Sequence, residues 1–146
     1  MKLLECHIAN FGQFSNYNLT FEDGMNVVMQ PNGWGKTTLA AFVKAMLYGF
    51  GTKRIRDVSA NERLRYRPWQ GGNYGGTLDF EHDGKQYRII RTFGDTARFD
   101  ECKVMDLATG KNCPEIGNNV GEWLFGLDSN AFQKSVFITA QDVDAD

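Results

Sequence analysis

Hydrophobic and polar residues alternate along the first 24 residues, which is the pattern of strands that bury one face. Segments 2–11 and 16–24 are predicted to be short strands, separated by Gly12 and a polar turn. The apolar run MNVVM at 25–29 follows and is bounded by a turn, which is typical of a buried central strand. The chain is therefore predicted to begin with strands of a sheet.

The spacing of apolar residues becomes helical over residues 36–48. Gly49 and Gly51 are expected to end this helix. Residues 52–75 are polar and rich in arginine and glycine, and they are predicted to form a long loop that carries function or is mobile. The apolar face of the helix is predicted to carry Leu39, Phe42, Val43, Met46 and Leu47.

The second half of the chain reads mainly as strands. Residues 75–93 are predicted to be a hairpin around the turn Asp83-Gly84. Residues 98–111 would add a third strand and complete an antiparallel β-meander that ends at the turn Thr109-Gly110. Strands on both sides of a helix, with a hairpin insertion, indicate an α/β domain with a mixed sheet. Two short helices and a final buried strand are predicted at 117–127, 128–134 and 135–141.

Composition restricts the class of protein. At 146 residues, 42% hydrophobic and 23% charged, the chain is predicted to be one globular domain. A net charge of −2 means that any contact with nucleic acid must use a local basic patch. The three cysteines lack metal-ligand spacing and fit a reducing compartment, and no apolar run is long enough to cross a membrane. We therefore expect a cytoplasmic protein.

Residues 30–37 lie between the predicted strand and helix, and they nearly match the phosphate-binding loop G-x-x-x-x-G-K-[ST]. Such a loop directs backbone N–H groups toward phosphate oxygens at the N-terminus of a helix. Gly33 and Gly35 permit the close approach, whereas Lys36 would reach the β- and γ-phosphates and Thr37 would ligate Mg²⁺. The residues predicted to bind ATP are Asn32, Gly33, Trp34, Gly35, Lys36, Thr37 and Thr38.

Two residues depart from this motif. Gln30 replaces the first glycine, which costs ~1 kcal/mol or more if the position requires a positive φ, but the phosphate-binding N–H groups remain. Trp34 is expected to point out of the loop, where it could shield the site, stack on a base, contact a partner or pack in the core. One alternative function is therefore a degenerate module that mediates assembly without hydrolysing ATP.

Groups that would complete hydrolysis are not evident near the motif. Asp106 is the nearest acidic candidate for Mg²⁺, but it ends a short apolar run in the meander and is expected to face solvent. Segment 69–77 is glycine-rich, but a strand is predicted to follow it, so it does not match a glycine-rich signature loop. A second alternative, a stand-alone P-loop kinase or NTPase, should also show an acceptor-binding lid, and the sequence shows none.

The order of motifs resembles the N-terminal lobe of an SMC-like ABC ATPase head, a family that includes RecF-, RecN- and SbcC-type repair ATPases. The resemblance covers almost the whole chain, and within the family it looks most similar to the bacterial YhaN-like branch. It implies a P-loop NTPase fold with residues 1–146 as one nucleotide-binding lobe. It rests on the segments HIANFGQFSNYNLTFEDGMNVV, PNGWGKTTL, AMLYGF, GGTLDFEHDGKQYRIIRTF and SVFITAQDVDAD.

The resemblance also implies roles for individual residues. Gln141 matches the Q-loop glutamine, which in this family contacts Mg²⁺ and the attacking water. Asn10 and Phe11 match a segment near the nucleotide, although Gly12 and Gln13 stand where some relatives carry a basic residue. Gln141 is therefore the predicted catalytic residue, and Thr37 and Gln141 are the predicted Mg²⁺ ligands.

The resemblance further implies partners. In this family a coiled coil and a C-terminal lobe follow the Q-loop, and two heads dimerise around two ATP molecules. The chain ends at Asp146, where that coiled coil would begin, so we expect an N-terminal half-head. It would be an ATPase when completed by the C-terminal lobe, and inactive or very weak alone. The implied function is in DNA repair or chromosome maintenance.

A basic segment follows the predicted helix and carries six of the 16 lysines and arginines. Only Asp57 and Glu62 offset this charge, and Tyr66 and Trp69 add aromatic surfaces. DNA binding is one hypothesis for this segment, and a solvated loop or contact with another lobe is the alternative. Arg91 is instead expected to make structural ion pairs. The six basic residues are Lys53, Arg54, Arg56, Arg63, Arg65 and Arg67.

Overall fold

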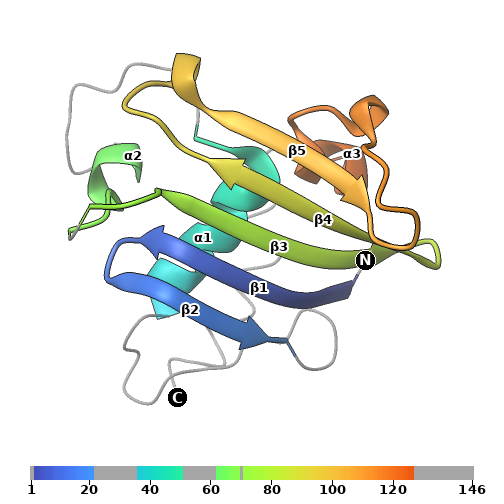
Figure 1. Cartoon of the computed structure of the whole chain (residues 1–146), viewed down its shortest axis with the longest axis horizontal. Coiled ribbons are helices and arrows are strands. Elements are labelled where there is room, and N and C mark those ends of the chain that lie inside the picture. Colours follow the sequence, from blue (N-terminus) through green and yellow to red (C-terminus); the bar gives the residue numbers. More distant parts are fainter. Residues whose placement is uncertain (1, 22–35, 51–61, 70, 127–146) are drawn as a thin grey trace.

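The computed structural model describes residues 2–21, 36–50, 62–69 and 71–126. In this part of the chain, five strands form one sheet in the order β2-β1-β3-β4-β5, and helix α1 packs against one of its faces (Figure 1). The strands are β1 (Lys2–Phe11), β2 (Phe14–Thr20), β3 (Gly75–His82), β4 (Lys85–Thr92) and β5 (Glu101–Asp106). The helices are α1 (Lys36–Tyr48), α2 (Glu62–Arg65), α3 (Val120–Phe125) and the 3-10 turns η3 (Ala97–Phe99) and η4 (Pro114–Ile116).

Neighbouring strands in the described part of the sheet are antiparallel. The predicted hairpin of β3 and β4 is confirmed: Asp83 and Gly84 have φ values of 51° and 77°, as a two-residue turn between twisted strands requires. Strand β5 completes the predicted meander. The prediction of a mixed sheet depended on buried strands at 25–29 and 135–141, which lie outside the described residues.

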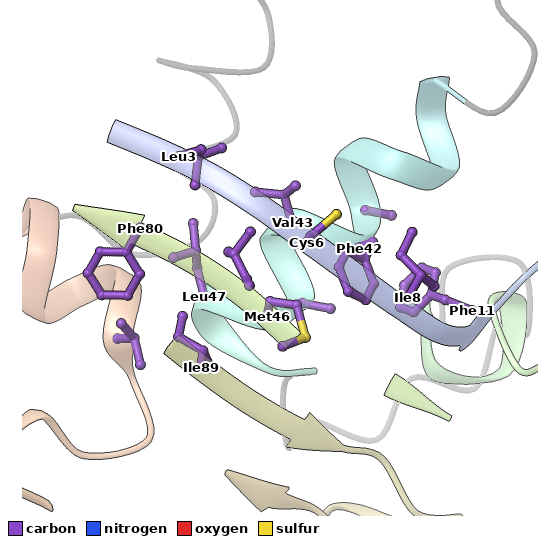
Figure 2. Close-up of a cluster of buried hydrophobic side chains, with 14 of the residues drawn as sticks. Leu3, Cys6, Ile8, Phe11, Phe42, Val43, Met46, Leu47, Phe80 and Ile89 are labelled. Carbon is purple, nitrogen blue, oxygen red and sulfur yellow. The ribbon is translucent and has the colours of Figure 1, made fainter. Parts of the chain in front are cut away.

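The core lies between the sheet and α1. Figure 2 shows α1 side chains facing those of β1, β3 and β4. All five residues predicted for the apolar face of α1 are buried, with Leu39 at 3% exposure and Phe42, Val43, Met46 and Leu47 at 0%. Burying each such side chain stabilises the fold by about 1.5–3 kcal/mol, so this face fixes how α1 lies on the sheet.

The other face of the sheet carries polar pairs, because side chains alternate between the two faces of each strand. Arg88 of β4 makes two hydrogen bonds, of 2.7 and 2.9 Å, to the buried carboxylate of Asp79 in β3. Nδ1 of His7 in β1 and Oδ1 of Asn18 in β2 lie 2.6 Å apart across the neighbouring strand pair.

Cys6 of β1 belongs to the buried core. Burial is the main cause that raises the pKa of its thiol to about 12, and the negative charges of Asp79 and Glu5 add to this effect. Cys6 is therefore a packing residue.

The segment predicted to be a long loop contains structure of its own. Helix α2 occupies Glu62–Arg65, and both Tyr66 and Tyr74 are buried. The backbone N–H of Gly12 donates to the carbonyl of Tyr66 at 2.7 Å, which joins the β1–β2 turn to the end of α2. Apolar burial by its tyrosines thus orders the described part of a segment that looks polar in sequence.

Arg91 makes a contact that differs from the predicted ion pairs. Its buried guanidinium donates to backbone carbonyls, with Nε 2.6 Å from the oxygen of Met46 and Nη2 3.3 Å from that of Leu47. Nη2 also donates to the carbonyl of Asn118, just before α3. Helix α1 has no basic residue in its last turn, so Arg91 supplies the positive charge that its C-terminal dipole favours.

None of the described helices combines the length and the apolar character needed to cross a membrane.

Replacing Arg91 with Met should lower the free energy of unfolding by about 3 kcal/mol or more, because buried carbonyls lose their donors. Arg91→Lys should recover only part of this loss, since one ammonium cannot reproduce the planar fork of donors. Urea denaturation measures both effects. Lys103→Met, at an exposed position on β5, is the control and should stay within about 0.5 kcal/mol of the unsubstituted chain. An equal loss in this control would contradict the assignment.

Candidate nucleotide-binding site

Helix α1 begins at Lys36, directly after the glycine-rich segment, as a phosphate-binding loop requires. Of the predicted nucleotide-binding residues, Lys36 and Thr37 are described by their backbone, in the first turn of the helix. The remaining predicted residues of the loop and the Q-loop lie outside the described residues, namely Gln30, Asn32, Gly33, Trp34, Gly35 and Gln141. Their roles remain predictions.

Thr38 is the predicted nucleotide-binding residue whose side chain is described. Its hydroxyl donates to the side-chain oxygen of Gln13 at 3.2 Å, so it is directed toward the β1–β2 turn. Gly12 in that turn has a φ of 58°, and a Cβ there would lie 3.1 Å from a side-chain carbon of Thr38 and 3.6 Å from Tyr66. The turn therefore packs closely against the start of α1.

The two residues matched to the segment near the nucleotide have structural contacts here. Phe11 is fully buried and stacks on Tyr66 with ring centroids 5.0 Å apart. Asn10 donates from its amide nitrogen to the carbonyl of Asn73 at 3.0 Å and accepts from the hydroxyl of Ser15 at 3.0 Å. Both residues thus order the turn that faces the start of α1.

Helix α2 contacts both α1 and the β1–β2 turn. Lys44 of α1 and Glu62 of α2 form an ion pair of 2.7 Å, with the Lys44 side chain 14% exposed. Together with the hydrogen bond from Gly12 to Tyr66, this pair connects α2 both to α1 and to the β1–β2 turn. The β1–β2 turn therefore lies beside Thr38 near the start of α1, where the phosphate loop is predicted to present its N–H groups, and α2 lies beside Lys44 in the second half of the helix.

The basic segment divides into residues of different character. Arg63 is 7% exposed, and its guanidinium donates to both carboxylate oxygens of Asp100, at 2.6 and 2.7 Å, and to the carbonyl of Gly94 at 3.0 Å. Its geometry is structural, which corrects its prediction as a DNA-contacting residue. Arg65 is exposed, and its guanidinium carbon lies 5.3 Å from the centroid of the Tyr66 ring.

The remaining basic residues are partly accessible or undescribed. Arg67 has a side chain that is 46% exposed, and it pairs with the exposed Asp95 at 3.2 Å. Arg65 and Arg67 therefore keep guanidinium surface that could meet a phosphate. Lys53, Arg54 and Arg56 lie outside the described residues.

Asp106, predicted to face solvent, is only partly exposed, and segment 69–77 leads into a strand as expected. Asp106 ends β5, and its carboxylate accepts the backbone N–H of Ala108 at 2.8 Å, which caps a turn. Strand β3 begins at Gly75 within the glycine-rich segment 69–77, which agrees with its rejection as a signature loop. Within the described ranges, no group of three or more His, Cys, Asp or Glu side chains could hold a metal ion.

Sequence reasoning missed Asp100, which organises a connection between two strands. Its carboxylate binds Arg63 and also accepts the backbone N–H of Gly94 at 2.8 Å. The partners are 37 residues apart, so no local spacing pointed to the pair. The available signal was weak: an acidic residue immediately before a strand and an arginine in an otherwise exposed basic run.

Comparisons with known proteins identify the family to which the chain belongs. A family model described as an AAA domain matches residues 5–142, so the chain belongs to the AAA domain family, a family of P-loop NTPases. The uncharacterized protein YhaN of Bacillus subtilis (strain 168) is 34% identical over 92 residues, which cover 62% of this chain and 8% of YhaN. The predicted resemblance to SMC-like and RecF-type ATPases, and to YhaN, is confirmed.

Further relatives are DNA double-strand break repair Rad50 ATPases. Those of Sulfolobus acidocaldarius and Methanosarcina acetivorans are 27% identical over 143 residues and 26% identical over 151 residues. The alignments cover 94% and 99% of this chain, but only 15% and 14% of those proteins. The chain therefore spans less than a fifth of the length of the curated relatives named here.

Arg63 and Arg65 should respond differently to truncation, because only one of them is buried. Arg63→Ala leaves the Asp100 carboxylate without its main partner and should cost about 3 kcal/mol of unfolding free energy. Arg65→Ala, the matched control two residues away, should change it by no more than about 0.5 kcal/mol. Urea denaturation of both variants gives the comparison, and similar losses would show that the ion pair does not order this region.

Proposed function

We propose that the chain is the ATP- and Mg²⁺-binding half of an SMC-like ATPase head that acts in DNA repair or chromosome maintenance. The observation that carries this proposal is the start of α1 at Lys36, directly after a glycine-rich segment with a P-loop pattern. Membership of the AAA domain family supports the same site. The Rad50 relatives support a role in DNA metabolism.

In this proposal, each part of the loop has a physical task. N–H groups at the start of α1 bind phosphate oxygens, because they are free of helix partners and the dipole there favours anions. Lys36 neutralises the β- and γ-phosphates, and Thr37 offers a hydroxyl oxygen, a donor type that Mg²⁺ prefers. Gln141 orients water and senses the metal. Bound Mg²⁺ would supply charge neutralisation at the phosphates.

Head dimerisation is the step that would couple ATP binding to movement of the heads. Two completed heads would enclose two ATP molecules, and hydrolysis would separate them. The chain contributes the phosphate-binding half, so its activity alone should be very weak. Steady-state hydrolysis by this chain alone, at rates typical of complete enzymes, would instead favour a stand-alone P-loop NTPase.

Replacing Lys36 with Ala should weaken ATP·Mg²⁺ binding at least about 10-fold, because a charged donor to the phosphates is lost. Isothermal titration calorimetry on the chain measures the affinity. Lys103→Ala removes the same charge from an exposed position on β5 and should leave the affinity unchanged. An unsubstituted chain without affinity for ATP·Mg²⁺ would contradict the proposal and leave the assembly module in its place.

Trp34 and Gln30 motivate that second candidate, a degenerate module, because both depart from the loop pattern. If the indole points out of the loop, Trp34→Ala should leave ATP affinity within about 0.5 kcal/mol of the original value, as surface substitutions do. The same calorimetry tests this. A large gain in affinity would mean that the indole fills the phosphate site, which supports the degenerate module.

A further inference from the structure

An open cavity of about 600 Å³ lies between two segments, formed on one side by Arg67, Pro68 and residues 71–74 and on the other by residues 92–95 and Phe99. Its lining includes the partly exposed Arg67 and the exposed Thr92, Asp95 and Phe99. Ligand pockets in proteins commonly span about 300–1,000 Å³, so a nucleoside-sized group fits. Gly71 leaves part of the wall open, since no atom lies within 4 Å of where its Cβ would be.

Phe99 is 64% exposed, whereas the other aromatic residues of the lining, Tyr74 and Phe93, are buried. Phe99 does not lie on a loose loop. Asp100, the next residue, binds Arg63 and the N–H of Gly94, which closes the connection between β4 and β5. Gly94 packs so tightly that a Cβ there would lie 2.4 Å from the Cβ of Phe99. The buried ion pair thus holds an exposed aromatic ring in place.

A positively charged side chain lies beside this ring. The guanidinium carbon of Arg98 lies 5.6 Å from the Phe99 ring centroid, and Arg98 is exposed. Arg67 lines the cavity and Arg65 lies two residues before it. Among the acidic groups nearby, Asp100 is paired with Arg63, and Asp95, the exposed carboxylate of the lining, is paired with Arg67. Arg98 beside the ring and the exposed part of Arg67 are therefore the groups available to an anion.

A second exposed aromatic residue lies next to the lining. Trp69 is 78% exposed and directly follows Pro68, which lines the cavity. Arginines interleaved with exposed aromatic rings are the surface on which single-stranded nucleic acids bind, because bases stack on the rings and phosphates meet the guanidinium groups. Paired bases are stacked inside a duplex and cannot enter a cavity of this kind.

We propose that this cavity binds an unpaired base of a single-stranded nucleic acid, with Phe99 as the stacking surface and Arg98 and Arg67 at the flanking phosphates. The backbone of Gly94 is already engaged, its N–H by Asp100 and its carbonyl by Arg63. In this proposal, stacking and charge provide the recognition, which gives little sequence preference. The inference deepens the proposed function and rests on it only for the choice of nucleic acid as partner.

The test is fluorescence anisotropy with the full chain and an oligothymidine of about 15 nucleotides, close to the upper site size of strand-binding modules. Phe99→Ala should weaken binding about 5- to 150-fold, the loss expected when a stacking ring is removed. Arg98→Gln should reduce the slope of log affinity against log salt by about 0.7, the value for one phosphate contact to a single strand. A blunt duplex of the same length should bind more weakly than the single strand.

Trp123→Ala is the matched control for Phe99→Ala. Trp123 is 41% exposed, lies on α3 and contacts His82 with ring centroids 5.2 Å apart, so it belongs to a different surface. Its truncation should leave strand binding unchanged. Urea denaturation should show that Phe99→Ala is folded, since the ring is mostly in solvent. Equal losses in both variants, no loss in Phe99→Ala, or preference for the duplex would overturn the inference.

Calorimetry with ATP·Mg²⁺ separates this inference from the proposed function. Phe99→Ala should bind ATP as the unsubstituted chain does, whereas Lys36→Ala should lose ATP affinity and keep strand binding. A loss of ATP affinity in Phe99→Ala would assign the cavity to the base of the mononucleotide and overturn the strand site. Absence of strand binding by the unsubstituted chain would also overturn it, and would assign the surface to contact with another protein segment.

Discussion

The guanidinium of Arg91 lies where strand β4, the end of helix α1 and the segment before α3 meet, and it donates to carbonyls of both neighbours. Burial lowers the pKa of Arg91, yet arginine stays charged in proteins, so this site holds a permanent buried cation. Such a charge is tolerated only where oxygen atoms surround it. The last turn of α1 provides them, because its carbonyls have no partners within the helix. The carbonyl oxygens stabilise the buried charge of Arg91, and the guanidinium supplies the hydrogen-bond donors that these carbonyls would otherwise lack.

The contact of Arg91 with the C-terminal end of α1 also helps to fix the direction of the helix at its N-terminus. Anion binding at the start of α1 requires the first N–H groups to point in one fixed direction. Arg91 holds the C-terminal end, the apolar face holds the middle against the sheet, and the β1–β2 turn packs on Thr38 near the beginning. A helix restrained at three levels is a rigid support for the loop predicted to bind phosphate.

The sequence predicts well those features that depend on neighbours in the chain. The extent of α1 follows from its apolar spacing, and the β3–β4 hairpin follows from Asp83-Gly84, whose backbone angles few other pairs adopt. Contacts between distant residues escape such reasoning. Arg63 and Arg65 look equivalent in the sequence, but Arg63 is buried and paired with Asp100, whereas Arg65 is exposed to solvent. The predicted phosphate-binding side chains remain predictions.

Helix α2 is too short to be stable alone, since isolated helices of fewer than about 12 residues are marginal in water. Its conformation must therefore come from its contacts: Glu62 with Lys44 of α1 on one side, and Arg63 with Asp100 on the other. The same two ion pairs connect α1 to the segment between β4 and β5 that carries Phe99. Any displacement of α2 would have to break one pair or carry both neighbours with it. A nucleic acid strand bound at the proposed cavity would therefore rest on a segment that cannot move independently of α1.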